Sequence, residues 1–201
     1  VATGFEMWDA GKLTQYSYGK SPNIVTGLEF ERLSNAGGIT GGEILLDNGK
    51  KPEKVAVIHC VGSRDHNAHE YCSRICCMYS LKQAHLVRDK TNASVYEFYM
   101  DMCTFGEGYE EFYERVQKEE GITMVRGRGA EVTVLPDGKL RVKGEDADMG
   151  QLVHVDVDMV VLSTAVEPPY DADRTAALFG LGRKESGFFA ENEAISQLGH
   201  H

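Results

Sequence analysis

Four of the five cysteines lie in one short stretch, residues 59–80 (HCVGSRDHNAHEYCSRICCMYS). They are Cys60, Cys72, Cys76 and Cys77. Thiolates are ligands for iron–sulfur clusters and for zinc. Zinc sites usually contain paired Cys-x-x-Cys spacings, which this stretch lacks, although His66 and His69 leave a mixed zinc site open. The third interpretation is a set of buried or loosely redox-active thiols, because free cysteine is often simply buried.

The elements around the cysteines predict how these thiols are positioned. The continuous apolar run at residues 55–58 predicts a buried central strand, which Cys60 ends. Apolar side chains at helical spacing predict a helix over residues 72–90, on which Cys72 and Cys76 would share one face. The four sulfurs are therefore expected to converge where the strand ends and the helix begins.

The turn between this strand and helix departs from a dinucleotide-binding turn. Such a turn carries several glycines that let the pyrophosphate approach the backbone, whereas Gly62 is the one glycine between Cys60 and the helix. Arg64, Arg74 and the positive end of the helix dipole favour thiolate over thiol. The turn is thus suited to thiolate ligands rather than to a nucleotide.

The rest of the chain predicts alternating strands and helices. Expected strands lie at residues 41–46, 93–101, 122–127 and 152–164, expected helices at 26–38 and 108–121, and a hairpin around PDGK at 130–146. Thr26 and Glu29 form an expected capping box, and Gly121 is expected to end the second of these helices. This order predicts an α/β fold. It is a doubly wound, Rossmann-like parallel sheet with a small antiparallel excursion, as in the pyridine-nucleotide domain of flavin disulfide reductases.

Composition limits the classes of partner. Lys and Arg number 21 against 31 Asp and Glu, a formal charge of -10, which disfavours nucleic-acid binding. No apolar run approaches the roughly 18 residues needed to cross a bilayer. The clustered cysteines predict a reducing cytoplasm rather than secretion. The absence of an initiator Met is interpreted as a piece of a longer polypeptide, and His200 and His201 are either native or tag residues.

Several segments together resemble the A subunits of heterodisulfide reductase and of its relative, the quinone-interacting membrane-bound oxidoreductase complex. They are CVGSRD, YCSRICCMYSLKQAHLV, FGEGYEEFYERV and LEFER, and the resemblance extends from VATGF to GFFAENE. It implies a thioredoxin-reductase-like flavoprotein with FAD and iron–sulfur clusters. Such a protein passes electrons between redox subunits, by bifurcation in some members, and associates with membranes only through those subunits.

The resemblance also implies roles for single residues. Cys60, Cys72, Cys76 and Cys77 would ligate a [4Fe–4S] cluster, Lys82 would lie near the flavin ring with Glu29 or Glu31 as a partner, and Ala2, Thr3 and Gly4 would form a flavin-domain turn. On this basis residues 1–50 are the tail of a flavin domain and a connector. Residues 51–166 are the nucleotide-domain fold, and 167–201 return toward the flavin domain. We expect the isolated chain to lack its cofactors and to be inactive; a homodimer stays open.

Two other functions stay open. One is a true NAD(P)H-binding domain, with Asp101 as the ribose-binding acid, although Glu107, Glu110 and Glu111 in FGEGYEE would repel phosphate. The other is a zinc-stabilised interaction module. The sequence departs from the family at Cys103, where a basic residue is expected, and this thiol is predicted to be packed or partly exposed. His59 is expected to be structural.

Overall fold

The computed structural model describes residues 1–191 and divides the chain into two compact units. The larger unit is Asp9–Ala165, and the smaller one combines residues 1–8 with the described residues from 166 onward. His200 and His201 lie outside the described residues. No helix in the described part of the chain is both long and apolar enough to span a bilayer.

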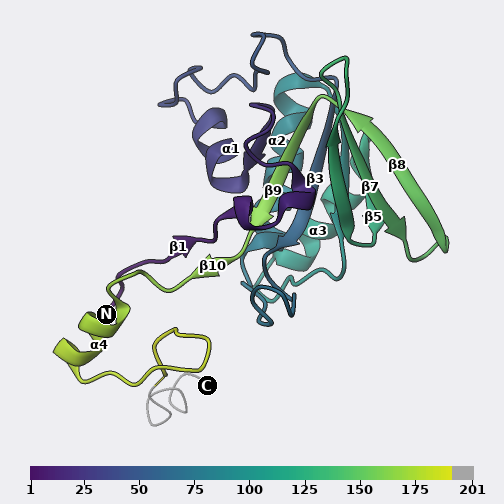
Figure 1. Ribbon diagram of the computed structural model, residues 1–201. Coiled ribbons are helices and arrows are strands. Elements are labelled where there is room, and N and C mark those ends of the chain that lie inside the picture. The colour runs from purple at the N-terminus through teal and green to yellow at the C-terminus, as the bar shows by residue number, and fades with distance from the viewer. Residues whose placement is uncertain (192–201) are drawn as a thin grey trace. The chain divides into compact units, whose positions relative to one another are not determined.

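A five-stranded parallel sheet forms the centre of the larger unit (Figure 1). In spatial order its strands are β2 (Ile24–Thr26), β9 (Met159–Thr164), β3 (Lys54–Val61), β4 (Ser94–Tyr99) and β5 (Ile122–Arg126). Strands β3 and β9 are almost entirely buried, as expected for apolar runs covered on both faces. The expected parallel sheet is confirmed, and β3 lies at its centre.

Three helices pack side by side on one face of this sheet. They are α1 (Gly27–Ser34), α2 (Cys76–Thr91) and α3 (Tyr109–Gln117), and short 3-10 turns at Ala10–Lys12 and Thr14–Tyr16 precede them in the chain. The capping box that begins α1 is present: the Thr26 side chain accepts a hydrogen bond from the Glu29 backbone, and the Glu29 carboxylate accepts one from the Thr26 backbone. The core between helices and sheet is apolar, with Val55, Val57 and Leu81 buried completely.

An antiparallel sheet covers the other face of the parallel sheet. Its strands are β6 (Gly129–Val134), β7 (Leu140–Asp146) and β8 (Gln151–Val157). Two glycines allow the layers to approach closely, because a Cβ at Gly129 would lie 3.0 Å from Ile58, and one at Gly144 would lie 2.9 Å from Phe98. The expected hairpin is confirmed. The single strand expected at 152–164 is wrong, because residues 151–157 pair with β7 as β8, and β9 returns the chain to the parallel sheet directly after Asp158.

The smaller unit contains a short antiparallel pair, β1 (Glu6–Met7) with β10 (Val166–Glu167), followed by helix α4 (Ala172–Phe179). The larger unit begins at Asp9 rather than at residue 51. The assignment of residues 1–50 and 167–201 to a flavin domain stays a prediction.

Three further local expectations were wrong. Residues 41–46 form a turn and an irregular segment instead of a strand, with Ile44 buried as a single anchor. Helix α2 begins at Cys76, so Cys72 lies in the preceding loop and does not share a helix face with Cys76. Helix α3 ends at Gln117, before Gly121, because Lys118 already caps it.

Candidate metal centre

A bulge at the end of β3 places Cys60. The pairing of β3 with β9 shifts between Ile58 and Val61, so that β3 carries one extra residue there. Cys60 has a φ of 58°, a left-handed conformation that is uncommon for residues other than glycine. Such outliers concentrate at functional sites, and a bulge redirects the side chain that it carries. Cys60 therefore turns out of the strand pattern toward the beginning of α2.

Three buried thiols lie in contact at this junction. Cys76 is hydrogen-bonded to both Cys60 and Cys77, and all three residues are at most 2% exposed. These bonds raise the pKa of Cys76, which keeps its single proton and shares it between the sulfurs of its two neighbours. The same bonds lower the pKa of Cys60 and of Cys77 against the opposing effect of burial. The geometry stabilises two thiolates around one thiol.

Cys72 stands beside a different thiol. It lies in the loop before α2, where the Arg74 backbone N–H donates to its Sγ at 3.3 Å. Its side chain is hydrogen-bonded to Cys103, and burial, followed by the charges of Cys72 and Cys77, raises the pKa of Cys103. As these side chains lie, no group of three or more His, Cys, Asp or Glu residues within 1–191 is positioned to hold a metal ion. Three of the expected ligands are nevertheless joined by hydrogen bonds, and the fourth contacts Cys103.

Hydrogen bonds and ion pairs hold the loop that carries Cys72, both within the loop and to neighbouring turns. Its backbone closes on itself, with the Arg64 N–H donating to the Tyr71 carbonyl at 3.1 Å. Arg64 also donates to the carboxylate of Asp101 at 2.7 Å, in the turn after β4, and Arg128 donates to Asp65 at 2.8 Å. The carboxyl ends of three adjacent strands are therefore joined at the cysteine site.

A buried ion pair lies behind the thiols. His59 on β3 hydrogen-bonds through Nε2 to Glu97 on β4, and the two side chains are 1% and 0% exposed. Burial lowers the pKa of His59, but the charge of Glu97 and the contact with Cys77 outweigh burial and raise it. Neither this pair nor the contact made by Cys103 was predicted from the sequence. The available signals were an acid inside the apolar strand VYEFY and a cysteine just beyond the end of that strand.

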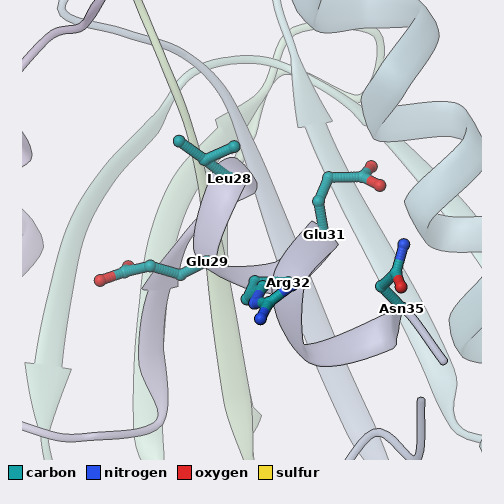
Figure 2. Close-up of a pocket in the computed structure, with 5 residues that line it drawn as sticks. All are labelled: Leu28, Glu29, Glu31, Arg32 and Asn35. Carbon is teal, nitrogen blue, oxygen red and sulfur yellow. The ribbon is translucent and has the colours of Figure 1, made fainter. Parts of the chain in front are cut away.

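Lys82 lies on α2 and forms an ion pair with α1. Its Nζ is 2.6 Å from Glu31 Oε1, which also accepts a hydrogen bond from Gln83, so Glu31 is confirmed as the partner of Lys82. Glu31 borders an open hollow of about 420 Å³ on α1, lined also by Leu28, Glu29, Arg32 and Asn35. Figure 2 shows Glu29 and Glu31 extending from α1 in opposite directions. Glu29 is bonded to Tyr18 rather than to Lys82.

Ala2, Thr3 and Gly4 belong to the smaller unit, where all three are exposed. Gly4 has a φ of 79°, which suits a glycine turn. Their contact with a flavin stays a prediction.

Comparison with known proteins gives close sequence relatives, although no family model matches the chain. Over 194 residues, 46% are identical to the A subunit of the H(2):CoB-CoM heterodisulfide,ferredoxin reductase of Methanothermobacter marburgensis. This match covers 95% of the chain and 29% of the relative. One of the iron-sulfur A subunits of the CoB–CoM heterodisulfide reductase of Methanopyrus kandleri is 44% identical over 196 residues. That match covers 94% of the chain and 30% of the relative. The chain is homologous to the A subunits of heterodisulfide reductases.

The homology to these oxidoreductase subunits confirms the resemblance noted in the sequence. The chain spans less than a third of the length of these relatives. Solved structures confirm the fold class: the thioredoxin reductases of Lactococcus lactis and T. acidophilum match with TM-scores of 0.56 and 0.52. Each match covers 95% of this chain and 50% of the other, at 14% and 12% identity.

Proposed function

We propose that this chain is the electron-transferring, nucleotide-domain-like segment of an FAD- and iron–sulfur-dependent oxidoreductase of the heterodisulfide reductase A type. In this proposal a [4Fe–4S] cluster is held by Cys60, Cys72, Cys76 and Cys77. The observation that carries it is the contact among three buried thiols at the carboxyl end of the central strand, where ligands bind in parallel sheets.

The donor set suits an iron–sulfur cluster. Thiolates are its preferred ligands, and the hydrogen bonds around Cys76 already favour thiolate at Cys60 and Cys77. Cys72 is the proposed fourth ligand, from the loop that the Arg64–Asp101 ion pair ties down. The cluster would supply one-electron transfer. The residues of the chain hold it, enclose it on the sheet side and set its charge environment.

Nucleotide binding is the weaker alternative. Asp101, the candidate ribose-binding acid, is paired with Arg64 and lies 4.0 Å from Arg126. Pyrophosphate binding needs a glycine-rich turn with close backbone approach, and residues 61–65 offer Gly62 alone. A zinc-stabilised interaction module is the remaining alternative. The identity of the bound metal, iron or zinc, decides between it and the proposed cluster.

FAD is proposed to bind the longer protein, with Lys82 near the ring. The chemistry of Lys82 suits this role, since a cation held by Glu31 at a partly exposed position can stabilise negative charge on a flavin. In the full-length protein, Lys82→Met should shift the flavin midpoint potential to a more negative value. The matched Lys118→Met, which removes an exposed Lys–Glu pair on α3, should not shift it. An unchanged potential in Lys82→Met would contradict the role.

The proposed partners are other redox subunits of a cytoplasmic complex that exchange electrons with the flavin and the cluster. The name of the Methanopyrus kandleri relative, which describes it as an iron-sulfur component of a heterodisulfide reductase, supports this placement.

The decisive experiment is anaerobic reconstitution of the 201-residue chain with iron and sulfide, followed by metal analysis. We expect about four iron and four sulfide per chain and broad absorption near roughly 400 nm, typical of thiolate-ligated clusters. Stoichiometric zinc, with no iron uptake under these conditions, would refute the proposal and favour the interaction module.

A further inference from the structure

The pair His59–Glu97 faces the layer that contains the cysteines. His59 follows Val57 by two residues on β3, and Glu97 follows Val95 by two on β4, so all four side chains lie on one face of the sheet. Val57 and Val95 belong to the apolar core beneath the helices. His59 and Glu97 therefore point toward the beginning of α2, where Cys77 lies.

The two ring nitrogens of His59 have different surroundings. Nε2 is bonded to Glu97, whereas Nδ1 is buried and makes no hydrogen bond of regular geometry to a described residue. The side chains of His59 and Cys77 are nevertheless within hydrogen-bonding contact, and each affects the other electrostatically. The Sγ of Cys77 also lies 3.7 Å from the carbonyl oxygen of Asp101. Nδ1 of His59 is thus a buried polar atom next to Cys77, a proposed ligand.

Burial of this pair is costly without a partner for the second nitrogen. Taking a carboxylate and an imidazole out of water carries a desolvation penalty that an isolated pair often fails to offset. The neighbouring core is apolar and includes Val57, Leu81 and Val95, so an apolar pair of similar volume is compatible with it. The polar pair therefore calls for a function that an apolar pair lacks.

We infer that His59, held by Glu97, is a positioning residue that donates a hydrogen bond from Nδ1 to the Cys77 sulfur of the bound cluster. This inference rests on the proposed function. A thiolate ligand carries no proton, so a hydrogen bond to it requires a proton on Nδ1, while the second ring proton stays on Nε2 facing Glu97. Hydrogen bonds from outer residues to the ligands of a metal site tune its properties, and those to cluster sulfurs tune the reduction potential.

The expected consequence is a raised reduction potential. A donor to a cluster sulfur stabilises the extra electron of the reduced state, so removing the donor shifts the midpoint to a more negative potential. The same removal need not prevent cluster assembly, because His59 is not one of the proposed ligands.

Two variants separate this role from a purely structural one. In His59→Gln, the longer amide reaches the Nε2 position and keeps a bond to Glu97 but loses the donor to Cys77. In His59→Asn, the shorter amide occupies the Nδ1 position and keeps that donor but leaves Glu97 unpaired. Tyr99→Phe is the control, because the Tyr99 ring lies 6.4 Å from His59 and its hydroxyl is hydrogen-bonded to Tyr113.

The test is a redox titration of the reconstituted 201-residue chain, with iron content and thermal unfolding measured in parallel. We expect His59→Gln to keep its iron and its melting temperature but to shift to a more negative midpoint. We expect His59→Asn to lower the melting temperature more but to shift the midpoint less. Tyr99→Phe should keep the midpoint potential and the iron content of the unchanged chain.

A wild-type midpoint in His59→Gln, at wild-type iron content, overturns the inference and leaves the cluster proposal intact. Shifts that follow the loss of stability in both variants also overturn it, because they indicate a structural role. If His59→Gln fails to fold, the double variant His59→Phe/Glu97→Leu, which removes both buried charges, takes its place. It should likewise keep its iron and shift to a more negative midpoint. Absence of iron uptake by the unchanged chain refutes the proposed function itself.

Discussion

Two strand-to-helix turns of the same sheet differ in how they shape the backbone. The turn after β3 places Cys60, Arg64 and Arg74 at positive φ, although none is glycine. The turn after β4 uses Gly108 at a φ of 78°, the residue that precedes α3. Positive φ costs roughly 1–2 kcal/mol for a residue with a Cβ and almost nothing for glycine. The first turn holds strained side chains in place, whereas the second only reverses the chain.

The two turns also differ in charge and burial. The turn after β3 carries arginines and leads into buried thiols. The hydrogen bond from Cys76 lowers the pKa of Cys60 most, and the charges of His59 and then Arg64 lower it further, against burial and the charge of Cys77. The turn after β4 is exposed and acidic, with Phe105 65% exposed and Glu110 in the first helical turn. The glycines of the second turn look like part of a phosphate site, but its charge opposes anions. Residue chemistry, rather than glycine content, distinguishes the site.

The largest expected difference between the turns concerns the metal. Cys76→Ser should abolish or strongly reduce iron uptake on anaerobic reconstitution, because Cys76 links the thiols of Cys60 and Cys77. Cys103→Ser, which alters a thiol beyond the end of β4, should retain about four iron per chain under the same conditions. The comparison fails if the two variants take up equal amounts of iron.

A backbone difference of moderate size is expected from glycine substitutions. Gly108→Ala should lower the free energy of unfolding by about 1–2 kcal/mol, since nothing crowds its Cβ position and the positive φ alone is unfavourable. Arg74→Gly should leave stability unchanged or raise it, because relief of strain offsets the greater entropy of the unfolded chain. Urea unfolding measures both, and a stable Gly108→Ala protein would show that this turn is not constrained.

The ion pair between Asp65, in the loop after β3, and Arg128 should stabilise the fold to an extent that depends on pH. A backbone hydrogen bond from Asn67 and the charge of Arg128 lower the pKa of Asp65, against the effect of burial. A lowered folded-state pKa stabilises the fold fully above the unfolded pKa of roughly 3.9, and this contribution is lost as pH falls through the folded value. Asp65→Asn should therefore cost about 1 kcal/mol or less at neutral pH.

The matching measurement is urea unfolding of both proteins at neutral pH and near the folded-state pKa. The stability difference between them should shrink as pH falls. A difference that persists at the lowest pH would mean that Asp65 contributes through packing rather than through its charge.

The smallest expected effect is the absence of nucleotide binding at either turn. Calorimetric titration of the chain with NADH should show no micromolar binding, because one turn lacks glycines and the other is acidic. Micromolar binding would remove the distinction between these turns and an ordinary dinucleotide site.

Local chemistry in the sequence was sufficient to predict most elements. Continuous apolar runs identified β3 and β9, PDGK identified the hairpin, and Thr26 with Glu29 identified the start of α1. These signals are local, because periodicity and capping depend on residues only a few positions apart. The segment at 41–46 was misassigned because one buried side chain, Ile44, produces a similar apolar signal without any strand partner.

The sequence by itself determined that four thiols follow a central strand, and therefore that they lie near the carboxyl edge of a parallel sheet. Only the tertiary structure decided which sulfurs meet. The bulge that turns Cys60 arises from a register shift against β9, a strand that lies far along the chain at Met159–Thr164. The placement of Cys103 beside Cys72, and of Glu97 beside His59, depends on the pairing of β3 with β4. Such contacts follow from sheet register, which no local pattern encodes.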